Sequence, residues 1–114
     1  MRDLTSPADL DEAIRRSHEQ PVVIFKHSAT CGTSAMAHEE IEAFVAGAPW
    51  ADVFVVSVHA GRALSDDIAK RFHVRHESPQ ALVIRDGKVS WHASHFRVTG
   101  DAVEAALSKA GNGG

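Results

Sequence analysis

Apolar positions along the chain follow two spacings, one typical of helices and the other of buried strands. Helical spacing predicts four helices, whose inward faces carry Leu10, Ala13, Ile14 and Ser17; Ala37, Ile41, Phe44, Val45 and Ala48; Leu64, Ile68, Ala69 and Phe72; and Val103, Ala106, Leu107 and Ala110. We expect Ser6 to cap the first helix, with Pro7 at its first position, and Gly111 to end the last. Short apolar runs predict buried strands at 22–26 and 52–58 and two further strands within 81–92.

The order of these elements indicates a fold class. Strand–helix–strand units of this length join parallel neighbours through a right-handed crossover. The Asp86-Gly87 pair favours a type I′ turn, which joins two antiparallel strands. We therefore predict an α/β, thioredoxin-like fold: a four-stranded mixed sheet flanked by helices, with an N-terminal helix. Residues 1–110 would form a single domain and residues 111–114 a disordered tail.

Composition narrows the possible partners. A chain of 114 residues that is 44% hydrophobic can bury one core without disulfides. It contains no run of about 18 apolar residues that could span a membrane, and its acidic N-terminal segment is unlike a secretory signal. Its net charge of -3 argues against a nucleic-acid partner. We therefore expect a cytoplasmic monomer that binds neither membranes nor nucleic acid.

Cys31, the single cysteine, falls between the strand at 22–26 and the helix that follows it. A helix N-terminus stabilises a thiolate, and nearby positive charge would do so further. Gly32 leaves space beside the thiol for a disulfide-bonded partner. The alternative is an inert cysteine buried as a small apolar residue. If the thiol is reactive, the supporting residues of the predicted site are Lys26, His27, Thr30, Gly32, Thr33 and Ser34.

Ser34 stands where a Cys-X-X-Cys oxidoreductase would carry its second cysteine. A mixed disulfide formed at Cys31 therefore has to be resolved by a thiol from solution or from another protein. This pattern predicts one-thiol chemistry. Ser34 either hydrogen-bonds the sulfur or serves only as a residue of the first helical turn, and the sequence leaves both open.

Pro79 directly precedes the third predicted long strand, the place of a cis-proline that faces the active cysteine in thioredoxin folds. The backbone of Ser78 would then pair with a bound thiol, and Glu77 would contact its polar groups. The alternative is an ordinary trans proline at the start of a strand.

The segments "FKHSATCGTSAMAHEE" and "RHESPQALVIRDGKVSWHASH" resemble the monothiol bacilliredoxins, the YtxJ-type redox proteins of the bacillithiol system, over roughly residues 20 to 110. The resemblance implies a thioredoxin-like fold, no bound cofactor, and removal of bacillithiol from S-thiolated cytosolic proteins. It assigns the nucleophile to Cys31, the helix serine to Ser34 and the cis-proline to Pro79. Gly32 departs from this family, which usually has proline there.

Two other functions remain open from the sequence. "CGTS" also resembles the Cys-Gly-Phe-Ser of monothiol glutaredoxins, with Thr33 in place of the phenylalanine, and implies an iron–sulfur cluster carrier with Cys31 as ligand. A thioredoxin-fold interaction domain with an inert thiol is the other.

The chain's 8 histidines raise the possibility of a metal site. The pairs His73/His76 and His92/His95 fall in predicted loops or strand ends, without the cysteine or carboxylate cluster that a tetrahedral site needs. We therefore expect no metal.

Overall fold

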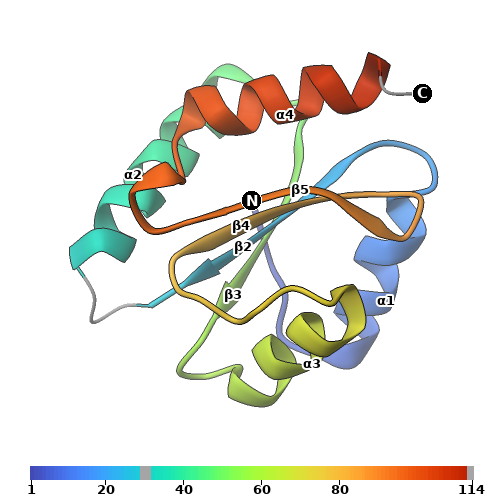
Figure 1. The fold of residues 1–114 in the computed structure, drawn as a ribbon, viewed down its shortest axis with the longest axis vertical. Coiled ribbons are helices and arrows are strands. Elements are labelled where there is room, and N and C mark those ends of the chain that lie inside the picture. Colours follow the sequence, from blue (N-terminus) through green and yellow to red (C-terminus); the bar gives the residue numbers. More distant parts are fainter. Residues whose placement is uncertain (29–31, 113–114) are drawn as a thin grey trace.

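Helices cover both faces of a mixed sheet in the computed structural model, which describes residues 1–28 and 32–112, with side chains to Ser108 (Figure 1). The elements, in chain order, are β1 (Arg2–Asp3), α1 (Pro7–Arg16), β2 (Val22–His27), α2 (Gly32–Gly47), β3 (Asp52–Ser57), α3 (Arg62–Phe72), β4 (Gln80–Arg85), β5 (Lys88–Ser94), the short 3₁₀ helix η1 (His95–Arg97) and α4 (Gly100–Asn112). The predicted order of helices, strands and hairpin is confirmed.

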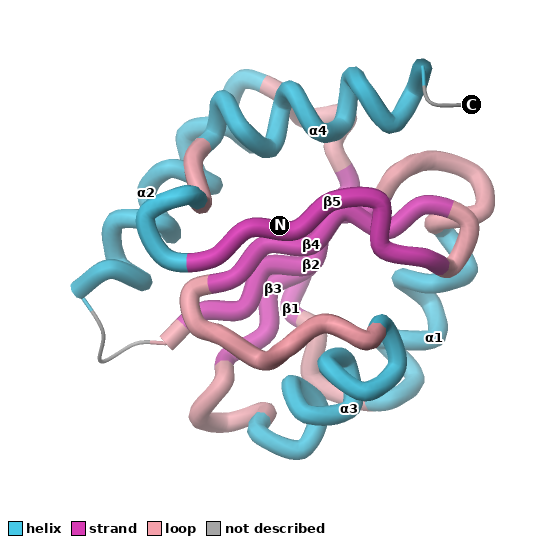
Figure 2. Tube along the Cα trace, in the orientation of Figure 1, coloured by secondary structure: helices cyan, strands magenta, loops and turns pink. Residues whose placement is uncertain are grey.

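The sheet has five strands in the order β1-β3-β2-β4-β5, as Figure 2 shows. Strands β1, β3 and β2 are parallel, whereas β4 is antiparallel to both β2 and β5. The mixed sheet was predicted, but the prediction of four strands was wrong because β1 was missed. Both residues of β1 are exposed, so no apolar pattern marks them. Backbone pairing with β3 holds the segment instead, and the Leu4 amide continues it by donating to the Val55 carbonyl at 2.8 Å.

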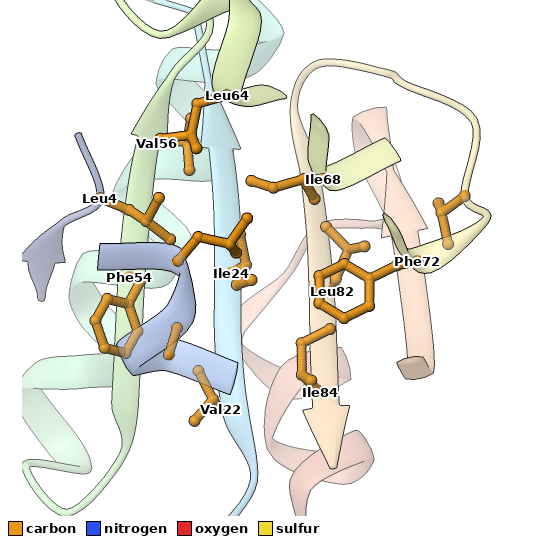
Figure 3. Packing of buried hydrophobic residues seen from close by; sticks show 13 residues of the cluster. Leu4, Val22, Ile24, Phe54, Val56, Leu64, Ile68, Phe72, Leu82 and Ile84 are labelled. Carbon is orange, nitrogen blue, oxygen red and sulfur yellow. The ribbon is translucent and has the colours of Figure 1, made fainter. Parts of the chain in front are cut away.

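Side chains of the central strands alternate between two apolar cores, as the two-residue period of a strand requires. Val22 and Ile24 of β2 pack under α1 and α3 together with Leu82 of β4 (Figure 3). Val23 and Phe25 point to the other face, where α2 and α4 cover the sheet. The long central strands are therefore buried on both faces, and this explains their continuous apolar runs.

Predicted local signals are largely confirmed. The Ser6 hydroxyl caps α1 by accepting from the Asp9 amide at 3.2 Å. Asp86 and Gly87 have φ of 53° and 76°, so both central residues of the hairpin turn are left-handed as expected. The end of α4 differs, since the helix continues past Gly111 to Asn112. The last two residues of the predicted tail lie outside the described residues.

Candidate functional site

The predicted site lies at the carboxyl end of β2, where the chain approaches the first residue of α2. In Figure 1 the loop between α3 and β4 reaches the same end of the sheet. Cys31 and Thr30 lie outside the described residues, so the predictions for these two residues stay predictions. Gly32 is the exposed first residue of α2, and a Cβ there would meet nothing within 4 Å. Packing therefore does not require glycine at this position.

Ser34 fastens the first turn of α2 to the end of β2. Its side chain is fully buried, and its hydroxyl accepts a hydrogen bond from the Ser28 amide at 3.2 Å. The Ser28 hydroxyl in turn lies 3.0 Å from Nε2 of His59. The hydrogen bond between Ser34 and Ser28 joins the first turn of α2 to the end of β2. A hydrogen bond from Ser34 to the sulfur stays a prediction, because Cys31 lies outside the described residues. Thr33, beside Ser34, is half-buried.

His27 points toward α2. Its ring centroid is 4.7 Å from that of His38, whose Nδ1 lies 2.9 Å from a carboxylate oxygen of Glu42. Partial burial, and secondarily the charge of His38, lowers the pKa of His27 below its usual value. The lowered pKa favours the neutral imidazole at pH 7. The prediction that His27 supports the thiol stays a prediction, because Cys31 lies outside the described residues.

Lys26 points to the opposite face of the sheet, under α3. It has no exposed surface, and its Nζ donates to the Ser65 carbonyl at 3.1 Å and lies 3.2 Å from Nδ1 of His76. Burial lowers the pKa of Lys26 from 10.5 to about 8, while Asp66 acts in the opposite direction. The sequence analysis named both Lys26 and His27 as supporting residues of the site, but strand alternation directs only His27 toward the α2 face.

The loop before β4 contains a cis peptide bond between Ser78 and Pro79, as predicted. The Pro79 carbonyl accepts from the His95 amide at 2.9 Å, which joins this loop to the end of β5. The Ser94 hydroxyl, and then the nearby His95, lower the pKa of the Glu77 carboxyl. Among the described residues, the buried Ser78 hydroxyl has no hydrogen-bond partner.

One histidine of each predicted pair contacts another side chain. His76 contacts Lys26, and Nε2 of His95 lies 3.6 Å from a carboxylate oxygen of Glu77. Across the part of the chain that the structure describes, no three histidine, cysteine or carboxylate side chains come together as metal ligands. No described helix is long and apolar enough to cross a membrane.

Sequence reasoning missed the partners of the site residues. It gave no role to Ser65 or His38, and it did not connect His76 with Lys26. One signal was available: a lysine in a continuous apolar run is buried with the strand and needs buried acceptors. The sequence alone does not identify those acceptors, because they lie 39 and 50 residues away along the chain.

Comparison with known proteins identifies the family. The family model described as "Monothiol bacilliredoxin BrxC" matches residues 2–103. The chain belongs to this family. The resemblance seen in the sequence is therefore confirmed, and with it the assignment to the thioredoxin-fold oxidoreductases.

Solved structures agree with this assignment. A candidate oxidoreductase with a thioredoxin fold superposes with a TM-score of 0.84 at 31% identity, covering 92% of this chain and 91% of that chain. Thioredoxin of Fasciola hepatica gives a TM-score of 0.77 at 19% identity over 96% and 98% of the two chains. A thioredoxin mutant of Halobacterium salinarum gives 0.75 at 18% over 95% and 88%. The two thioredoxins show that the bacilliredoxin shares their fold.

Proposed function

We propose that this bacilliredoxin is a monothiol thiol–disulfide oxidoreductase that removes bacillithiol, or a similar low-molecular-weight thiol, from mixed disulfides on cytoplasmic proteins. Cys31 is its nucleophile, and the small thiol is a co-substrate. Family membership supports the reaction class and the thiol. The observation that carries the one-thiol mechanism is Ser34. It is buried in the first turn of α2, at the place of a second cysteine, in a chain whose only cysteine is Cys31.

The proposed reaction consists of two exchanges. The Cys31 thiolate attacks the bacillithiol sulfur of the mixed disulfide, forming a bond between these two sulfurs as the substrate disulfide breaks. The substrate cysteine leaves as a thiolate and takes a proton from solvent. A second thiol, in its thiolate form, then attacks the bacillithiol sulfur held on Cys31. This step forms a new disulfide with bacillithiol and releases the Cys31 thiolate.

The loop at Glu77–Pro79 would supply the binding surface. In this proposal the Ser78 backbone pairs with the peptide-like part of the bound thiol, and Glu77 contacts its polar groups. The hydrogen bond from His95 to the Pro79 carbonyl fixes this loop against β5, so that the surface is formed before the thiol binds.

Intact mass spectrometry tests the proposal. The protein is incubated with bacillithiol disulfide, and in a second sample with a peptide that carries bacillithiol on its cysteine. We expect one bacillithiol adduct on the wild-type protein, release of free peptide, and neither event with Cys31→Ser. A Cys31→Ser protein that still frees the peptide would contradict the mechanism. A coloured dimer after anaerobic reconstitution with iron and sulfide, whose colour depends on Cys31, would favour a cluster carrier instead.

A further inference from the structure

Lys26 is the charged residue whose side chain is fully buried in the described part of the chain. Burying an ammonium group is costly unless it is hydrogen-bonded. The lysine lies on a central strand, β2, close to the predicted nucleophile in sequence but on the sheet face opposite α2. A direct contact with the helix that follows Cys31 is therefore not its role, and its partners indicate another one.

Lys26 connects three elements of the fold. From β2, its ammonium group donates to the Ser65 carbonyl of α3 at 3.1 Å and reaches Nδ1 of His76, in the loop before β4, at 3.2 Å. Burial, and then the positive charge of Lys26, lower the pKa of His76. Since an ammonium group can only donate, a hydrogen bond between the two requires Nδ1 of His76 to accept, with the ring proton on Nε2.

Gln80 holds the same loop from the neighbouring strand. It is the register partner of Lys26 across the antiparallel β2–β4 pair, and it too is buried. Its side-chain amide donates to the Arg75 carbonyl at 2.9 Å. Two adjacent buried side chains thus bind consecutive loop residues. Lys26 contacts the His76 ring, and Gln80 donates to the Arg75 carbonyl.

Arg75 and His76 come just before Ser78 and Pro79, whose backbone the proposed function assigns to thiol binding. The loop crosses the end of β2, near the point where the chain turns toward α2 (Figure 1). A shift of the loop would therefore displace the thiol-binding backbone relative to the start of α2. Exchange reactions are sensitive to such displacements, because they depend on the alignment of the reacting atoms.

We propose that Lys26 is a positioning residue for the exchange reaction: through His76 it holds the Ser78–Pro79 loop where the mixed disulfide has to bind. The inference rests on the proposed function for the reaction itself. The contact of Lys26 with the loop can be tested separately from that reaction, by measuring amide hydrogen exchange in the loop.

Four variants separate this role from general effects on the fold. Lys26→Met removes the donor while keeping a side chain of similar length, and His76→Ala removes the acceptor. His76→Asn keeps an acceptor, since its side-chain oxygen can take the place of Nδ1. Lys88→Met removes an exposed lysine of β5 and serves as the matched control.

Hydrogen exchange monitored by mass spectrometry should show faster exchange of the segment 74–80 in Lys26→Met and His76→Ala, by about tenfold for the loss of one charge-assisted hydrogen bond. The kcat/KM of thiol–disulfide exchange with the bacillithiol-bearing peptide should fall by about the same factor in both variants. The double variant should lose no more loop protection and no more kcat/KM than either single variant, because both changes remove the same interaction. His76→Asn and Lys88→Met should stay close to wild type in both measurements.

The outcomes distinguish failure of this inference from failure of the proposed function. Normal protection of 74–80 and normal kcat/KM in Lys26→Met would overturn the positioning role alone. Additive losses in the double variant would also overturn it, since the two residues would then act separately. A wild-type protein without exchange activity would overturn the proposed function, whatever the loop shows. If Lys26→Met does not fold, the same comparisons are made with His76→Ala and His76→Asn, because His76 is only half-buried.

Discussion

The buried ammonium of Lys26 should give the protein's stability a specific dependence on pH. Burial lowers the pKa of Lys26 from 10.5 to about 8, a difference of about 2.5 units. Because one unit corresponds to about 1.4 kcal/mol, the charged form costs about 3 kcal/mol in the folded state relative to the unfolded chain. This is the net cost, since the opposing effect of Asp66 is already included in the pKa.

The pH window follows from the direction of the shift. Below pH 8 both folded and unfolded chains hold the proton on Lys26, so the cost is present in full. Between pH 8 and 10.5 the folded chain has released the proton while the unfolded chain still binds it. The free energy of unfolding therefore rises with pH across this window, by about 3 kcal/mol from this group.

Other charged groups near Lys26 belong to α3 and to the loop. Asp66 acts on Lys26 directly, whereas Arg62, Asp66 and Glu77 act on its partner His76. Taking the difference in the free energy of unfolding between two matched variants cancels most of the contribution of these other charged groups. Urea unfolding of Cys31→Ser and of Cys31→Ser/Lys26→Met is measured from pH 7 to 10.5, with the thiol absent from both. The chain contains no tyrosine, so no phenol ionises in this range.

The stability of the lysine-containing protein should rise by about 3 kcal/mol relative to the methionine variant between pH 8 and 10.5. Two stability curves that stay parallel over this range would refute the reasoning, because Lys26 would then have the same pKa in the folded and unfolded chains. A relative fall would refute it as well.

Two smaller predictions concern the site and the hairpin. Ser34→Ala should lower the free energy of unfolding in urea by about 1 kcal/mol, because the Ser28 amide loses its hydrogen bond to the serine hydroxyl. Thiol exchange should continue in this variant. Abolished thiol exchange would instead assign Ser34 a role in the chemistry. Gly87→Ala should also cost about 1 kcal/mol, because Gly87 has a φ of 76°. An added Cβ there would be no closer than 3.6 Å to the His18 ring, so the expected cost comes from the backbone conformation and not from a clash. An unchanged unfolding midpoint would contradict this cost and would show that the backbone had relaxed.

The fold was predictable wherever the chain buries a periodic apolar face. The helices around Leu10 and Ile41 and the hairpin turn at Asp86-Gly87 each carry a local signal that tertiary structure reinforces. Strand β1 was not predictable in this way. It consists of two exposed residues, and its pairing with β3 depends on backbone hydrogen bonds that do not distinguish one side chain from another.

Two local features of the predicted site could be predicted from the sequence, whereas the contacts of its side chains could not. The Ser78–Pro79 cis bond followed from its place before a long strand, and Ser34 from its spacing to Cys31. The environments of Lys26 and His27 did not follow, because a strand buried on both faces gives no polar side from which to assign direction. Two consecutive residues of β2 thus reach different layers, one under α3 and the other against α2.

This division between the two faces bears on how the proposed thiolate is stabilised. Lys26 points away from the α2 face, and His27, which points toward it, has a pKa lowered by burial and His38, which favours the neutral imidazole at pH 7. The first turn of α2 contains no acidic residue, although the first turns of α1 and α4 contain Asp9 and Asp101. An acidic residue there would oppose a second negative charge at the same helix end. If neither of these two side chains supplies a positive charge, the proposed thiolate would depend on the peptide dipoles of α2, which do not titrate. The pH dependence of the proposed thiol exchange would then follow the ionisation of the thiol itself.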